Sequence, residues 1–153
     1  MHGTILCAVT DSQAGRSAAR MAAVLAERLG LRLVLAHVVD GMPRGGGESL
    51  TARQGRAGAE QRLTELATEL KLADDADLRV EVGDRAAVLA QLAAEEGADL
   101  VVLGSELRGV RGRNLRCGLA RDLEATTAAP VLVAPPQTVR RSERRLAAAE
   151  AAG

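Results

Sequence analysis

The chain has 153 residues, of which 47% are hydrophobic and 26% charged, the balance of a single globular domain with a real core. Aromatic side chains are absent, and the formal net charge is +0. Proteins that read single-stranded nucleic acid stack bases on aromatic rings and attract phosphates with basic surfaces, so this composition argues against a nucleic-acid partner. The absence of an overall positive field equally disfavours an anionic membrane surface as a partner.

Cysteine usage and the first residues predict a reduced, soluble, cytoplasmic protein. Cys7 and Cys117 lie far apart and lack the spacing of a disulfide scaffold or a metal site. Residues 1–9 are too short for a signal peptide, and no apolar run approaches the ~20 residues that span a bilayer. We expect Cys7 to be a core side chain, whereas Cys117, at a predicted helix start near arginines, keeps a redox role open.

Apolar strands alternate with helical patterns along the chain. Strands are predicted over residues 4–9, 31–39, 77–82, 100–103 and 131–134, and helices over residues 18–29, 49–70, 84–97 and 115–127. The third strand alternates apolar and charged residues, so we expect it near a sheet edge with one face in water. Asp84 is predicted to cap the third helix.

This alternation of strands and helices predicts right-handed βαβ units and a doubly wound parallel α/β sheet. Residues 1–136 are expected to form that domain. Residues 137–153, which are rich in arginine and alanine, are expected to form a separate C-terminal tail, either as a surface helix or as a frayed end.

The stretch from Leu100 to Leu119 is the part of the chain that looks built for a ligand. Gly104 ends a buried strand, and a loop rich in glycine and arginine leads into the next helix. Backbone N–H groups at a helix start, together with arginine side chains, favour an anion such as phosphate. The alternative is a plain crossover with solvated arginines. The glycines and arginines of this stretch are Gly104, Gly109, Gly112, Gly118, Arg108, Arg111, Arg113 and Arg116.

Outside the glycine- and arginine-rich stretch, the polar residues give weaker evidence for a functional site. In doubly wound sheets, ligands bind outside the carboxyl ends of strands where the winding reverses, so we expect the turn after Val9 to face the glycine loop. His37 lies in an apolar strand with no second ligand nearby, which predicts a packed, hydrogen-bonded histidine and no metal. The chain has no Gly-Lys-Ser/Thr, no His-x-Gly-His and no clustered loop carboxylates. We therefore assign no catalytic residue and expect a protein that is not an enzyme.

Five short motifs, in this order and spacing, resemble the universal stress protein family from Ile5 to about Pro135. They are Ile5-Leu6-Cys7-Ala8-Val9-Thr10-Asp11-Ser12, Leu35-Ala36-His37-Val38-Val39-Asp40, Gly83-Asp84, Gly97-Ala98-Asp99-Leu100-Val101-Val102-Leu103-Gly104-Ser105, and Pro130-Val131-Leu132-Val133. The resemblance implies a Rossmann-like five-stranded parallel sheet of order 3-2-1-4-5 with helices on both faces. It also implies a homodimer that pairs the last strands of two copies through Val131, Leu132 and Val133.

The resemblance further implies an adenine-nucleotide site, because some members of the family bind ATP. Those members carry an aspartate at the end of the first strand and a Gly-x(2)-Gly-x(9)-Gly-Ser/Thr loop. Here Thr10 holds the aspartate position, the glycines are spaced differently, and Leu119 replaces the hydroxyl residue, so the motif is degenerate. The residues expected to contact ATP or another adenine nucleotide are Ala8, Val9, Thr10, Asp11, Ser12, Val38, Gly104, Ser105, Gly109, Arg111, Gly112, Gly118, Leu119 and Ala120.

Two functions therefore compete. The first is a regulatory stress-protein module that binds an adenine nucleotide between the first and fourth strands. The second is a stress protein without a nucleotide, which acts through homodimerisation and docking of a protein partner. A lost hydrogen bond to a charged group costs ~1.5–3 kcal/mol, so the departures at Thr10 and Leu119 leave both functions open.

Overall fold

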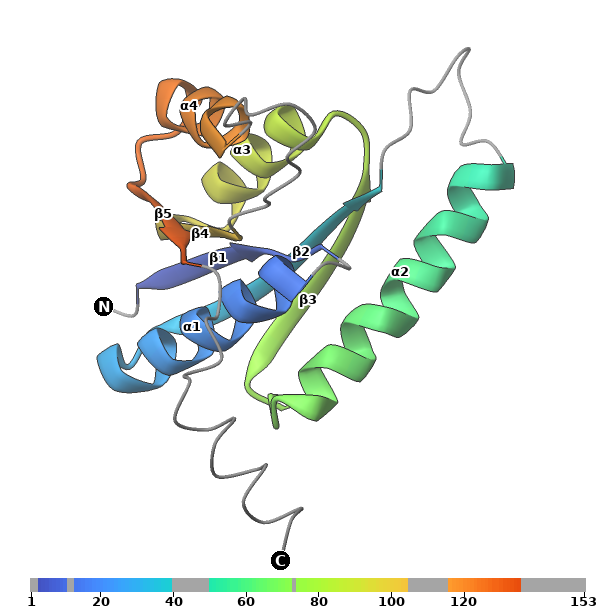
Figure 1. Cartoon of the computed structure of the whole chain (residues 1–153), viewed down its shortest axis with the longest axis horizontal. Helices are drawn as coiled ribbons and strands as arrows, with labels where there is room; N and C mark the ends of the chain where they lie inside the picture. Colours follow the sequence, from blue (N-terminus) through green and yellow to red (C-terminus); the bar gives the residue numbers. More distant parts are fainter. Residues whose placement is uncertain (1–2, 11–12, 40–49, 73, 105–115, 136–153) are drawn as a thin grey trace, which may run out of the picture.

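The structure is a computed structural model, and it describes residues 3–10, 13–39, 50–72, 74–104 and 116–135. The predictions for the glycine- and arginine-rich loop at residues 105–115 and for the C-terminal tail lie outside these ranges. The elements in chain order are β1 (Thr4–Ala8), α1 (Gln13–Leu29), β2 (Arg32–Val39), α2 (Leu50–Glu69), β3 (Ala76–Val82), α3 (Arg85–Glu95), β4 (Ala98–Gly104), α4 (Arg116–Thr126) and β5 (Val131–Ala134) (Figure 1). All the predicted strands and helices are present, although α1 begins at Gln13 instead of Ala18.

The strands form one parallel sheet of order β3-β2-β1-β4-β5, so the predicted fold class and strand order are confirmed. β1 is the central strand and pairs with β2 on one side and with β4 on the other. The chain winds outward from β1 to β3, and α3 then carries it back across the sheet to β4. The winding therefore reverses between β1 and β4.

Helices cover both faces of the sheet, which explains why the central strands lack an alternating pattern. Figure 1 shows α1 and α2 on one side of the sheet and α3 and α4 on the other. Ile5 and Cys7 of β1 pack into the core beneath α1 and α2, whereas Leu6 and Ala8 pack into the core beneath α3 and α4. Every residue of β1 is buried as a result.

β3 is an edge strand with one polar face, as its alternation predicted. Its Ala76 and Val80 pack against the core beneath α2. On the opposite face Arg79 forms ion pairs with Glu81 of the same strand and with Glu95 and Glu96 at the end of α3. Charged side chains on an edge strand discourage pairing with another chain.

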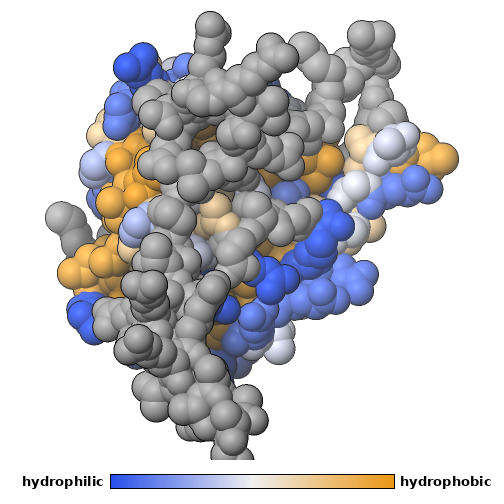
Figure 2. All heavy atoms as spheres, in the orientation of Figure 1, coloured by the Kyte–Doolittle hydropathy of each residue, from blue (hydrophilic) through white to orange (hydrophobic). Residues whose placement is uncertain are grey.

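The start of α3 and the buried side of α2 agree with what their sequences indicate. The predicted cap of α3 is confirmed, since the Ala87 N–H donates to the Asp84 carboxylate at 3.0 Å. α2 buries the stripe Ala59, Leu63, Leu66 and Ala67. Its outer side is largely hydrophilic in Figure 2, although the exposed Leu50 at its start is hydrophobic.

Cys7 is a fully buried core side chain, as expected. Burial raises the pKa of its thiol from its ordinary value of about 9 to about 12, so the sulfur stays protonated at neutral pH. Among the described residues, no helix is long and apolar enough to cross a bilayer. Within those same ranges, no three His, Cys, Asp or Glu side chains gather as a metal site.

Candidate functional site at the carboxyl edge of the sheet

The ends of β1 and β4 meet at the first turn of α1. A Cβ atom on Gly15 would lie 2.4 Å from the carbonyl oxygen of Thr10, and a Cβ atom on Gly104 would lie 2.6 Å from the carbonyl oxygen of Ala14. Only glycine allows backbones to approach this closely. Thr10, after β1, and Gly104, at the end of β4, are therefore packed on the same helical turn.

This meeting point lies where the winding of the sheet reverses. Cys7 pairs with Val102, so β1 and β4 leave the sheet side by side at their carboxyl ends. The prediction that the turn after Val9 and the segment beyond Leu103 lie at one end of the molecule is confirmed as far as Thr10 and Gly104. This is the position at which open α/β sheets bind ligands.

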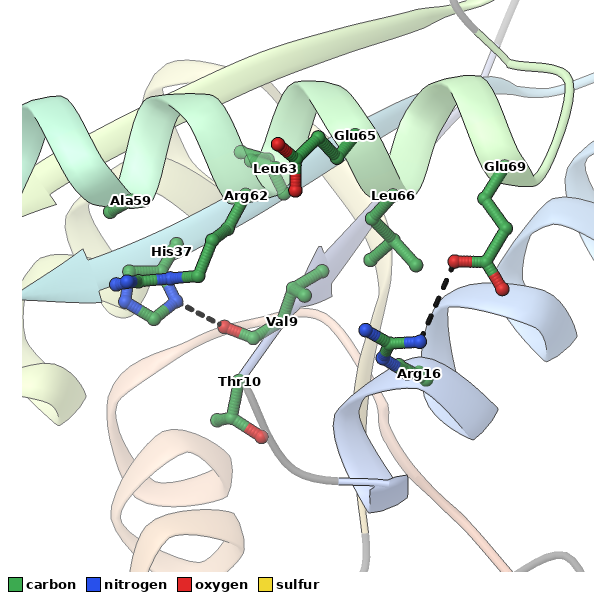
Figure 3. A pocket seen from close by; sticks show the side chains of 10 residues that line it. All are labelled: Val9, Thr10, Arg16, His37, Ala59, Arg62, Leu63, Glu65, Leu66 and Glu69. Carbon is green, nitrogen blue, oxygen red and sulfur yellow. Dashed lines mark hydrogen bonds and ion pairs between the residues drawn. The ribbon is translucent and has the colours of Figure 1, made fainter.

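A cavity of about 250 Å³ lies beside Thr10, between α1, α2 and the carboxyl ends of β1 and β2 (Figure 3). Its apolar surface comes from the end of β1 and from the buried stripe of α2. Its polar surface comes from side chains of α1, α2 and β2. The lining residues are Val9, Thr10, Arg16, His37, Ala59, Arg62, Leu63, Glu65, Leu66 and Glu69.

His37 connects this cavity to β1. Its Nδ1 lies 2.8 Å from the carbonyl oxygen of Val9, which confirms the prediction of a hydrogen-bonded histidine. A carbonyl oxygen only accepts, so Nδ1 carries a proton and donates it; when the ring is neutral, Nε2 keeps its lone pair. Among the described residues, Nε2 has no hydrogen-bond partner.

Charged side chains of both signs line the cavity. Arg16 of α1 reaches Glu69 of α2 at 3.5 Å and bounds one end, where Arg20 approaches the same carboxylate at 3.5 Å. These side chains are about half exposed, so the pairs stabilise the fold only weakly. Arg62 and His37 bound the other end in the view of Figure 3. With two arginines balanced by Glu65 and Glu69, the lining favours a polar ligand group over one of high charge.

The structure turns several predicted contact residues toward the core. Ala8 and Val38 are buried beneath α3 and α4, so only their backbone atoms are available to a ligand. Leu119 and Ala120 pack against that same core cluster. The side chain of Leu119 therefore has a packing role at the position where the family pattern has a hydroxyl group. Gly118 is exposed, and no atom of the described residues lies where its side chain would extend.

The remaining predicted contacts lie outside the described residues. These are Asp11, Ser12, Ser105, Gly109, Arg111 and Gly112, and the side chain of Cys117 is likewise not described. Sequence reasoning did not identify Arg16, Arg62 or Glu69 as lining residues. A weak signal was present, since Arg62, Leu66 and Glu69 share helical spacing and so lie on one side of α2.

Comparisons with known proteins agree with this architecture. A universal stress protein family protein from Burkholderia pseudomallei is 27% identical, with a TM-score of 0.66 over 89% of this chain and 97% of that chain. A universal stress protein in complex with cAMP is 20% identical, with a TM-score of 0.68 over 89% and 99%. The universal stress protein of Archaeoglobus fulgidus in complex with dAMP is 17% identical, with a TM-score of 0.63 over 88% and 98%.

At identities under 25%, the cAMP and dAMP complexes support the fold alone. None of the curated protein sequences matches the chain significantly. The model of the universal stress protein family, however, matches residues 1–135, which is most of the chain and includes all nine helices and strands described. The chain belongs to the universal stress protein family.

Proposed function

We propose that the chain is a regulatory module that binds an adenine nucleotide at the carboxyl edge of its sheet, in the crevice between β1 and β4. The observation that carries this proposal is the packing of Thr10 and Gly104 on one turn of α1, at the reversal of the winding. A ligand there would contact backbone groups from two strand ends and the first turn of a helix. Such groups suit phosphate and ribose oxygens.

The ligands of two structural relatives support the choice of nucleotide. One universal stress protein was solved with cAMP and another with dAMP, and both ligands join an adenine base to a phosphate group. In this chain the cavity next to Thr10 is smaller than the ~300–1,000 Å³ of typical small-molecule pockets. Its volume suits one part of a nucleotide, with the remainder of the ligand lying across the strand ends.

The test is a calorimetric titration of the purified chain, cleared of carried-over ligand, with AMP, ATP and cAMP. We expect a micromolar dissociation constant for at least one of them. At a ligand concentration 100 times that constant, the free energy of unfolding should rise by about 2.7 kcal/mol. Lack of binding at millimolar concentrations of all three nucleotides would contradict the proposal.

Gly118 offers a matched pair of variants. It lies in the first turn of α4, where no atom of the described residues stands in the way of a side chain. Gly118→Glu should weaken nucleotide binding at least tenfold because its carboxylate repels phosphate, while a negative charge in the first turn suits the helix dipole. Gly118→Ala should stabilise the fold by about 0.5–1 kcal/mol and should bind more tightly than Gly118→Glu. Equal affinities for the two variants would place the phosphate elsewhere.

We also propose that the protein pairs with a second copy through β5. β5 is an edge of the sheet, and its Leu132 leaves 37% of its surface exposed. An unpaired strand with exposed apolar side chains favours such pairing. Light scattering should give twice the chain mass, and Leu132→Lys should shift the protein to monomers. If the parent protein is monomeric at about 100 µM, this interface is excluded.

A dimer formed through β5 is also compatible with the alternative function, in which the protein docks a protein partner without a nucleotide. The calorimetric titration with nucleotides distinguishes the two functions. Nucleotide binding by the parent protein favours the regulatory module, whereas a dimer that binds none of the three nucleotides favours the docking function.

A further inference from the structure

We propose that the cavity between α1 and α2 receives the base of the nucleotide, and that His37 makes the site select a 6-amino purine over a 6-oxo purine. This inference rests on the proposed nucleotide function and adds to it the residue that determines base specificity. The base would lie on the apolar surface of the cavity, and Nε2 of His37 would accept a hydrogen bond from its exocyclic amino group.

The size and polarity of the cavity fit a purine base. The cavity volume of about 250 Å³ accommodates a purine ring system but leaves little room for a triphosphate. Val9, Leu63 and Leu66 offer the apolar contact that a ring requires, and Ala59 adds a small apolar side chain near His37. Because Thr10 lines the cavity and also packs on the turn that meets Gly104, a ligand in the cavity could continue directly into the crevice.

The hydrogen bond of His37 determines what its free edge can recognise. Nδ1–H is committed to the Val9 carbonyl at 2.8 Å, which also holds the ring in place. Nε2 of the neutral ring therefore presents an acceptor, without a partner among the described residues. It can pair with the 6-amino group of adenine, whereas the 6-oxo group of hypoxanthine or guanine would place two acceptors against each other.

Sites that hydrogen-bond a particular polar group reject analogues that cannot pair with it, because both partners then lose their hydrogen bonds to water. Arg62 lies at the same end of the cavity and carries only donors, so its own preference would favour the 6-oxo purine. His37 would thus favour the 6-amino purine and Arg62 the 6-oxo purine. Substituting each residue in turn shows which of them determines the selectivity.

The experiment compares AMP with IMP, which differ at this one position of the base. The parent protein should bind AMP at least tenfold more tightly than IMP. His37→Asn should reduce that ratio to about one, since its amide N–H can still donate to the Val9 carbonyl while the acceptor at the Nε2 position is gone. Arg62→Met should keep or increase the ratio.

Further variants separate recognition from folding. Thr64→Ala is the matched control on α2, because Thr64 is exposed, lies outside the cavity lining and donates its hydroxyl to the Glu60 carbonyl; it should change neither affinity. Ala59→Leu should weaken both AMP and IMP at least tenfold by filling the cavity. His37→Gln is a second test of base selection, because its amide group can turn either its oxygen or its nitrogen to the base and should also bring the ratio to about one.

The outcomes distinguish this inference from the proposed function. If the parent protein binds neither AMP nor IMP, the nucleotide function fails and the base site fails with it. If AMP binds but folded His37→Asn and His37→Gln keep the parent ratio, the nucleotide function stands and the role of His37 is refuted. Unchanged affinity in folded Ala59→Leu would overturn the placement of the base in this cavity.

Discussion

The amino edge of the sheet, where the strands begin, and the carboxyl edge, where they end, are built differently. At the amino edge, polar groups satisfy one another within the protein. The Thr4 N–H donates to the Asp99 carboxylate at 2.8 Å, and this contact joins the starts of β1 and β4. Arg32 bridges Asp77 at 2.7 Å and Glu96 at 2.8 Å, which joins β2, β3 and the end of α3. This edge has the contacts of a stabilising framework.

At the carboxyl edge, by contrast, the backbones of helix and strands approach closely. Gly15 and Gly104 allow α1 to touch the ends of β1 and β4. A cavity opens beside Thr10, and Nε2 of His37 is without a partner among the described residues. The comparison suggests that one edge stabilises the fold while the other is left free to bind, as expected where a rigid scaffold positions a ligand site.

The largest effect is expected from a single methyl group at the carboxyl edge. Gly15→Ala would place its Cβ within 2.6 Å of three atoms of Thr10, two of them backbone atoms that cannot move aside cheaply. We expect the free energy of unfolding to fall by about 2–3 kcal/mol in urea denaturation, despite the better helix propensity of alanine.

Gly58→Ala is the matched control for that prediction. It makes the same change within α2, where the nearest atom is the flexible end of Arg62 at 3.6 Å. We expect a gain of about 0.5–1 kcal/mol. Equal effects of the two substitutions would show that α1 is not packed tightly on Thr10.

A smaller effect on the free energy of unfolding is expected at high pH from Cys7, which lies in the core. The pKa of the Cys7 thiol is about 12 in the folded chain, above its ordinary value, because burial disfavours the thiolate. The unfolded chain therefore loses this proton first, so the contribution to stability is full below about pH 9 and is lost as the pH rises toward 12.

Relative to Cys7→Val, the parent protein should lose about 1.4 kcal/mol of unfolding free energy between pH 8 and pH 10. Urea denaturation of both proteins at the two pH values measures this difference. Parallel pH dependences would mean that the thiol is accessible to water in the folded state.

The smallest effect is expected at the polar edge strand. Hydrogen bonding to Glu81 raises the pKa of Arg79 above its already high usual value, so the guanidinium group keeps its charge. Arg79→Met should lower the free energy of unfolding by about 1 kcal/mol at low salt, because Glu81 and Glu95 are well exposed and the more buried Glu96 keeps Arg32 as a partner. The difference should shrink in 1 M NaCl, and a salt-independent loss would point to packing instead.

Much of the fold could be predicted because its signals are local. Continuous apolar runs identified the buried strands, the alternation from Asp77 to Val82 identified an edge strand, and Asp84 marked the start of α3. The strand order came from the family resemblance, since periodicity alone does not order strands.

The cavity could not be predicted, because its lining depends on how two helices rotate and tilt against the sheet. Arg16 and Glu69 are 53 positions apart in sequence (69 − 16), and nothing local indicates that they meet at 3.5 Å. The tight contact of Gly104 with Ala14 is equally non-local. In the sequence, Leu119 stands where the family pattern has a hydroxyl group that could bind a ligand. The structure shows that its side chain packs against the core.

Amide hydrogen exchange with and without AMP tests the contrast between the edges most directly. The account predicts that AMP slows exchange at the carboxyl edge, in the peptides that contain Val9, Thr10, Gly15 and Gly104, and leaves the peptides around Arg32 and Asp99 unchanged. Protection centred on Arg32 and Asp99, or no protection at saturating AMP, would contradict the assignment of binding to the carboxyl edge.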